Sequence, residues 1–213
     1  MVFDQPSNLG PAPERVQFSG NELGELMNAL HKVDGIVRSV ENISVETGIE
    51  LLQSEGRKGA FTASGVTSEE GAKTHFTVTD AKSVPVLNID LQVRNLADDK
   101  QDMIATISRP GESVPLETVH SSFSEGGVRN NDPVVQVDID VQGADHKLLR
   151  HGTGSLTIDD RTVDVKFSDG SGRPSARSMK LSLDGQNVHL VEHGRETVTG
   201  TSVGLSTLKY EIR

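Results

Sequence analysis

The sequence predicts a mainly β fold: an antiparallel β-sandwich or jelly-roll-like barrel with one N-terminal amphipathic α-helix. From about residue 58 onward, apolar and polar residues alternate along short segments, as in strands with one buried and one solvated face. Before that point, apolar residues recur at spacings of three and four, which is typical of a helix. The chain is therefore expected to comprise an extended or mobile segment at 1–18, a helical segment at 19–56 and an antiparallel β domain at 57–213.

The predicted helix covers about residues 20–40. Ser19 and Glu22, three residues apart, have the form of a capping box at its start. An apolar stripe with heptad spacing follows, consisting of Leu23, Leu26, Leu30, Val33, Val37 and Val40. Two interpretations stay open: the stripe docks on the rest of the chain, or it drives self-association. Residues 41–57 are ambiguous, because Gly48 interrupts a pattern that fits a second short helix or a strand.

The clearest strand pattern lies at residues 135–142, where valine and isoleucine alternate with glutamine and aspartate. Runs at 87–93, 163–167 and 179–183 share this alternation. Half-solvated antiparallel strands give such a pattern, whereas buried parallel strands are continuous apolar runs. Asp184 and Gly185 lie between two alternating runs and form a strong hairpin signal. A meander of hairpins is therefore expected in the C-terminal part.

Composition restricts the partners but leaves the compartment open. The chain has 213 residues, a formal net charge of −10 and no cysteine. An acidic chain lacks the clustered cations of a nucleic-acid-binding surface, so no nucleic-acid partner is expected. Without cysteine there are no disulfides or thiolate ligands, in either a reducing or an oxidising compartment. No ordinary signal peptide and no transmembrane segment are evident, so we expect a soluble protein without membrane insertion.

The string His189-Leu190-Val191-Glu192-His193 matches the H-x-x-E-H signature of a class of zinc proteases. That chemistry requires a helix, in which residues four apart share one face. The string follows the Asp184-Gly185 hairpin signal and is predicted to be a strand, which would place its two histidines about 13 Å apart. A looser metal site would require neighbouring strands to bring together His146, His151, His189 and His193.

Asp138 and Asp140 project from the same face of a predicted strand, about 7 Å apart. Acid/base catalysis on glycosides can use such a separation. Carboxylates on the wet face of an antiparallel strand are more commonly solvated, where they oppose edge-to-edge aggregation. No nucleophile elbow, P-loop or dinucleotide fingerprint is present in the sequence. We therefore assign no catalytic residue, metal ligand or cofactor.

The sequence predicts a non-enzymatic β-rich protein that acts through protein–protein contacts, as a structural subunit of a homo-oligomer or larger assembly. The heptad stripe would make the contact. An alternative is a carrier of a small apolar ligand or lipid, whose β-barrel cavity the helix would plug or cover. A third hypothesis is a metal-dependent hydrolase that uses the C-terminal histidines.

Overall fold

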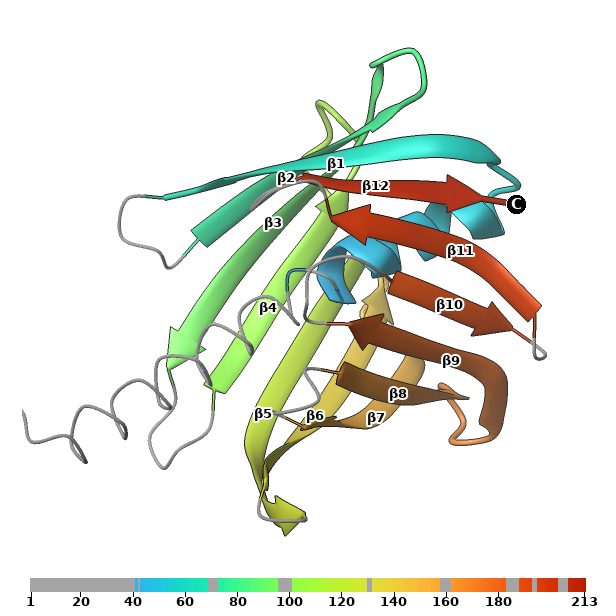
Figure 1. The fold of residues 1–213 in the computed structure, drawn as a ribbon. Helices are drawn as coiled ribbons and strands as arrows, with labels where there is room; N and C mark the ends of the chain where they lie inside the picture. The colour runs from blue at the N-terminus through green and yellow to red at the C-terminus, as the bar shows by residue number, and fades with distance from the viewer. Residues whose placement is uncertain are drawn as a thin grey trace, which may run out of the picture.

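The computed structural model describes residues 41, 43–68, 73–95, 101–129, 132–157, 162–182, 188–192, 195–202 and 207–213. These residues form twelve strands and one helix, at 43–54 (Figure 1). The predicted helix at 20–40 lies outside the described residues, and so does the Asp184-Gly185 hairpin signal.

The sheet is a single antiparallel meander that closes on itself. Each strand pairs with the next strand in the chain, and β1 pairs with β12. The strands are β1 (Gly59–Thr67), β2 (Lys73–Asp80), β3 (Pro85–Asn95), β4 (Gln101–Ser108), β5 (Glu117–Arg129), β6 (Asp132–Gly143), β7 (Leu148–Thr157), β8 (Thr162–Asp169), β9 (Pro174–Ser182), β10 (Val188–Glu192), β11 (Arg195–Ser202) and β12 (Thr207–Ile212).

The prediction of a mainly β, antiparallel fold with a helix before the strands is confirmed. The finer alternatives, a sandwich or a jelly roll, are not. A jelly roll needs Greek-key connections and a sandwich needs two packed sheets. The described strands instead follow one another in chain order around one closed ladder.

Along β3 and β6 the wall of the barrel is mainly apolar inside and polar outside. In β6 the four aliphatic side chains at odd positions from 135 to 141 are each 1% exposed, whereas Gln136 and Asp138 between them are exposed. β3 repeats the pattern, with Leu87 and Ile89 fully buried. The predicted runs at 87–93, 135–142 and 163–167 are thus strands, in β3, β6 and β8. Register keeps the inward side chains together, because neighbouring residues in a ladder share a face.

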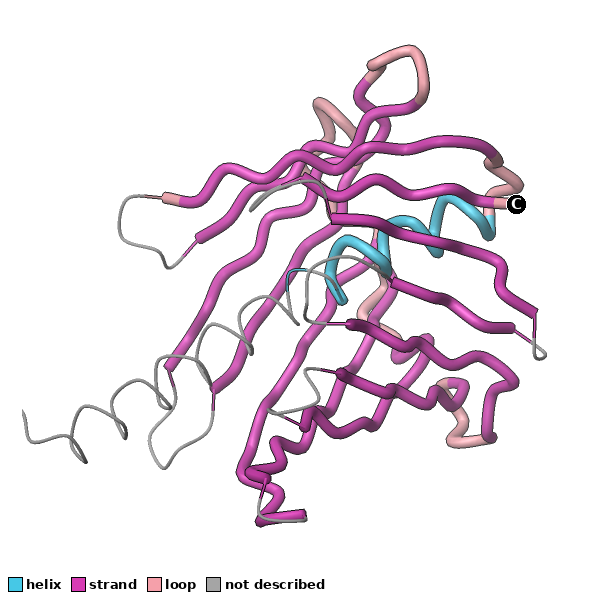
Figure 2. The backbone as a smooth tube through the Cα atoms, viewed as in Figure 1, coloured by secondary structure: helices cyan, strands magenta, loops and turns pink. Residues whose placement is uncertain are grey.

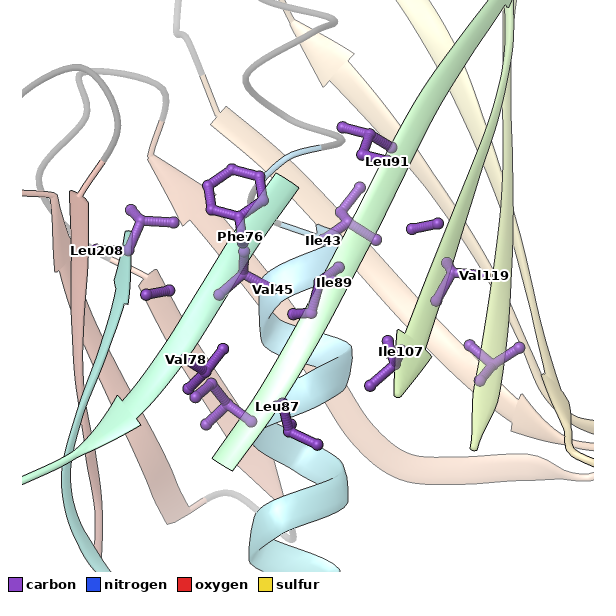
Figure 3. Packing of buried hydrophobic residues seen from close by; sticks show 14 of the residues in the cluster. Ile43, Val45, Phe76, Val78, Leu87, Ile89, Leu91, Ile107, Val119 and Leu208 are labelled. Atoms are coloured by element: carbon purple, nitrogen blue, oxygen red, sulfur yellow. The ribbon is translucent and has the colours of Figure 1, made fainter. Parts of the chain in front are cut away.

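The helix at 43–54, called the inner helix below, lies inside the barrel (Figures 1 and 2). Residues 43–50 are all buried. Because they span more than two turns, the helix is enclosed on every side. Its apolar side chains join the inward residues of the wall in one hydrophobic core, shown in part in Figure 3. The ambiguous segment at 41–57 is therefore largely helical.

Packing stabilises the inner helix against weak local propensity. Ile43, Val45 and Thr47 are β-branched and Gly48 is a glycine, and all four residue types are poor helix formers. Gly48 allows a close approach to β3, because a Cβ at this position would lie 3.0 Å from Cδ1 of Ile89. The segment is helical because the surrounding wall stabilises it, as expected for short helices in general.

The inner helix ends in a Schellman motif at Gly56, which has a positive φ of 78°. The Gly56 N–H donates to the Gln53 carbonyl at 2.9 Å, and the Arg57 N–H donates to the Leu52 carbonyl at 3.0 Å. Both bonds satisfy carbonyls that the end of a helix would otherwise leave without donors. The turn leads the chain directly into β1.

We predict that Ile49→Ala lowers the free energy of unfolding by about 2–5 kcal/mol, because it removes a fully buried side chain from the inner helix. Urea denaturation followed by circular dichroism measures this change. Val66→Ala is the control, since Val66 is 73% exposed on β1. Equal midpoints for the two variants would contradict burial of the inner helix.

Candidate functional site

A buried ion-pair network links the inner helix to the wall. The Arg150 guanidinium, on β7, lies 3.0 Å from the Glu50 carboxylate on the helix. The same Nη2 atom donates to Glu117, the first residue of β5, at 3.4 Å. The side chains of Glu50 and Glu117 are 2% and 8% exposed. One guanidinium therefore serves two enclosed carboxylates, one from the helix and one from the wall.

Glu46 lies one turn before Glu50 and is just as deeply enclosed, at 2% exposure. Among the described residues, neither oxygen of its carboxyl group has a hydrogen-bond partner. Burial raises the pKa of Glu46 well above its ordinary value, and repulsion from Glu50 raises it further. Glu46 is therefore a buried acid that is protonated far more readily than an exposed glutamate.

Tyr210 faces this part of the helix from β12. It pairs in the ladder with the buried Phe61 of β1 and is itself 2% exposed, so its ring points into the barrel. Its hydroxyl group has no hydrogen-bond partner among the described residues. Burial raises the pKa of Tyr210 well above its ordinary value, and the nearby Glu46 carboxylate adds to the effect. We call Glu46, Glu50, Glu117, Arg150 and Tyr210 the lumen site.

Helix geometry explains why Glu46 and Glu50 lie on one face of the inner helix. Residues two apart in an α-helix are about 200° apart around the axis, so Glu46 lies nearly opposite Gly48. Gly48 contacts β3. Glu46 and Glu50, four residues apart, share the other face, toward Arg150 on β7 and Tyr210 on β12. The carboxylates thus face the part of the wall that runs from β7 to β12.

The lumen site is energetically expensive. A buried polar group without a partner costs about 1–3 kcal/mol, and a buried charge costs more. Buried groups with strongly perturbed pKa values and a specific charged neighbour are typical of functional sites. Glu46 and Tyr210 meet both conditions. We therefore regard the lumen site as the candidate functional site.

The sequence-predicted contact residues Leu23, Leu26, Leu30, Val33, Val37 and Val40 lie outside the described residues, as does His193. The H-x-x-E-H string begins in β10, so the strand prediction is confirmed for residues 188–192. His146 is an exposed turn residue with a positive φ of 60°. His151 is on β7, which β8 and β9 separate from β10, so it is not on a strand next to His189.

Asp138 and Asp140 lie on the outer face of β6, as predicted. Asp140 accepts a hydrogen bond from His151 Nδ1 at 2.7 Å, and both side chains are more than a third exposed. His75 and Asp90 form a second pair of this kind, also at 2.7 Å, between β2 and β3. Among the described residues, no three His, Asp or Glu side chains are arranged to hold a metal ion. These pairs are cross-strand contacts on the outer surface.

The lumen site was not predicted from the sequence. One pattern could have indicated it, since Glu46 and Glu50 are the two charged residues in the otherwise uncharged stretch 43–54. Two carboxylates four residues apart share a helix face, but only once the segment is known to be a helix. Glu117, Arg150 and Tyr210 gave no comparable signal, because they belong to three separate strands.

We predict that Arg150→Met lowers the free energy of unfolding by about 3–5 kcal/mol, because it removes the cation that Glu50 and Glu117 share in a buried environment. Urea denaturation measures the change. Lys147→Met is the control, since Lys147 forms an exposed ion pair with Asp145 and should change stability little. A small effect of Arg150→Met, matching that of the control, would show that the buried network is not required.

We predict that Glu46→Gln removes a pH dependence of stability. A raised folded-state pKa stabilises the fold fully below the unfolded value, near 4.5, and this contribution is lost as pH rises through the folded value. As the pH rises from the unfolded-state pKa of Glu46 through its folded-state pKa, the wild-type protein should therefore lose stability relative to Glu46→Gln. Denaturation midpoints at a series of pH values measure the difference. The exposed Glu211→Gln, on β12, should track wild type, and a constant offset between wild type and Glu46→Gln would refute the prediction.

Comparison with protein-family models, with curated proteins and with solved structures found no match to this chain. In the described part of the chain, no helix is long and apolar enough to cross a membrane.

Proposed function

We propose that this protein is a non-enzymatic domain that acts through protein–protein contacts, as a subunit that self-associates through its N-terminal heptad stripe. In this proposal the barrel is the rigid anchor and the stripe is the assembly element. The observation that carries it is the enclosure of the inner helix, which joins the stripe-bearing segment to the interior of the barrel.

The attachment of the inner helix supports this role. The wall encloses the helix on all sides, and Arg150 adds an ion pair to Glu50. At the start of the described helix, Thr74 of β2 donates a hydrogen bond to Glu41 at 3.3 Å. The stripe ends at Val40, one residue earlier. Because the stripe continues into a helix that is fixed inside the barrel, contacts made by the stripe would also hold the barrel in the assembly.

The outer wall also suits a contact role. It carries polar side chains on the described strands, and several hairpin turns are stabilised by aspartates. Asp80 accepts from the backbone N–H groups of Lys82 and Val84, and these bonds lower the pKa of its carboxyl group. Such turns keep the rim ordered. An ordered polar surface is suited to protein–protein contacts.

The two alternatives have weaker support. A carrier of apolar ligands needs an empty apolar interior, whereas aliphatic side chains of the inner helix pack against the β2, β3 and β4 side of the lumen. A hydrolase that uses the C-terminal histidines needs them on neighbouring elements. His151 and His189 are instead on strands that two others separate.

We predict that the full chain is an oligomer and that Leu26→Glu with Leu30→Glu weakens its association by more than tenfold, because charges cannot be buried in an apolar seam. Light scattering on a sizing column, over a range of concentrations, measures the mass. Asn28→Glu with Ser39→Glu is the matched control, since it adds the same charge to the segment outside the stripe.

Two outcomes would refute the proposal. One is a single-chain mass for the wild-type protein at every concentration. The other is an equal loss of association in the stripe variant and in its charge-matched control, which would indicate general repulsion between acidic chains. Circular dichroism of each variant checks that the barrel is retained.

A further inference from the structure

The inner helix lies inside the wall without being part of its ladder. Each strand pairs with the next strand in the chain, and β1 closes the ladder with β12. The polar ties between helix and wall include the buried ion pair of Glu50 with Arg150 and, where the helix ends, the pair of Glu55 with Arg109. Apolar packing adds to these ties. The helix can therefore leave its place without breaking a pair between strands.

The turn that joins the inner helix to β1 is free to bend. Residues 54–58 are all exposed. Gly56 and Gly59 have positive φ values of 78° and 98°, and a Cβ at either position would meet no heavy atom within 4 Å. Glycine adopts such φ values without strain and has more backbone freedom than other residues. The turn at 54–58 can therefore act as a hinge that keeps the helix tethered to β1.

Glu46 is poorly accommodated inside the barrel. It is 2% exposed, and neither oxygen of its carboxyl group has a hydrogen-bond partner among the described residues. Glu50 follows one turn later on the same helix face, and the Arg150 guanidinium contacts Glu50 and Glu117. An ionised Glu46 is therefore a buried charge, whereas water would hydrate the same carboxylate outside the barrel. Ionisation of Glu46 thus favours exit of the helix.

Proton linkage gives the direction and the size of this effect. Burial raises the pKa of Glu46 well above its ordinary value, and repulsion from Glu50 raises it further, whereas exit returns the pKa to near 4.5. Below about pH 4.5 the carboxyl group is protonated in both positions, and pH has no effect. Between the two pKa values each pH unit favours exit about tenfold. Above the raised pKa the effect levels off.

The other described charged or titratable groups of the lumen site are Glu50 on the helix, Glu117 on β5, Arg150 on β7 and Tyr210 on β12. Arg150 remains a cation throughout, and both carboxylates share its charge. Burial raises the pKa of the Tyr210 phenol well above its ordinary value of 10, so Tyr210 stays neutral. Neither Arg150 nor Tyr210 therefore changes charge near neutral pH.

We propose that the inner helix is a releasable plug, which leaves the lumen transiently about the hinge at 54–58 as Glu46 loses its proton. While Glu46 is protonated, apolar packing and the ion pair of Glu50 with Arg150 hold the plug in place. Release exposes the apolar lumen and uncouples the N-terminal segment from the wall. The plug acts within one chain, so it does not depend on self-association through the heptad stripe.

Thiol labelling is a direct probe of release, because the chain has no cysteine. Ser44→Cys places a thiol on the inner helix at a position that is 0% exposed. The Ser44 hydroxyl group has no hydrogen-bond partner among the described residues, so the substitution breaks no bond there. Ser54→Cys is the matched control, because Ser54 lies on the same helix but is exposed. A methanethiosulfonate reagent reacts with accessible thiolate, so the ratio of the two labelling rates measures the open fraction at each pH.

We expect the labelling rate of Ser44→Cys, divided by that of Ser54→Cys, to rise by up to about tenfold per pH unit and then to level off. Adding Glu46→Gln should remove this rise, because the amide keeps the shape of the protonated acid and cannot ionise. Adding Glu211→Gln, which changes an exposed glutamate of β12, should leave the rise unchanged. A rate ratio that is independent of pH, or that rises equally with Glu46→Gln, overturns the proposal.

Urea separates release of the helix from unfolding of the whole chain. Release exposes less surface than unfolding does, so labelling of Ser44→Cys should depend on urea less steeply than the unfolding transition followed by circular dichroism. Equal slopes would mean that the thiol reacts only after global unfolding, which also overturns the proposal. If Glu46→Gln fails to fold, the pH dependence and the urea slope of the single-cysteine chain still decide.

Discussion

The interior of a closed barrel must be filled, and the rest of the structure depends on this constraint. Eight strands enclose a lumen that inward side chains alone can fill, and the diameter grows with strand number. Twelve described strands close this ladder, so their side chains need an additional element between them. The inner helix is that element. Gly48 lets it approach β3, and the Schellman motif at Gly56 returns the chain to the wall at β1.

Enclosure of a helix has a consequence for its polar residues. A surface helix turns its charged side to water, but a helix inside a barrel has no such side. Glu46 and Glu50 must therefore meet the wall. Glu50 forms an ion pair with Arg150, and this pair links the inner helix to the wall. The Glu46 carboxyl group has no hydrogen-bond partner among the described residues. The same geometry that stabilises the barrel thus leaves one acidic side chain buried without a hydrogen-bond partner among the described residues.

The interior of the barrel holds the inner helix, through apolar packing and the ion pair between Arg150 and Glu50. The proposed self-association would act through the stripe that ends at Val40. The inner helix, at 43–54, follows the stripe closely in the sequence. The outer wall carries cross-strand pairs such as Asp140 with His151. Its polar alternation keeps the barrel surface hydrated.

Local periodicity in the sequence was sufficient to predict strands and their buried faces. The alternation at 135–142 predicted β6 and its buried face. The same reasoning predicted a strand at 188–192, although these residues belong to a string that matches a zinc-protease signature. Local periodicity could not predict that the sheet closes into a barrel, because the pairing of Phe61 with Tyr210 joins opposite ends of the β domain. Nor could it choose between helix and strand at Gly48, or find the lumen site. Those features were decided by tertiary structure, because burial of Glu46 and helicity of a β-branched segment arise only when the closed wall surrounds them.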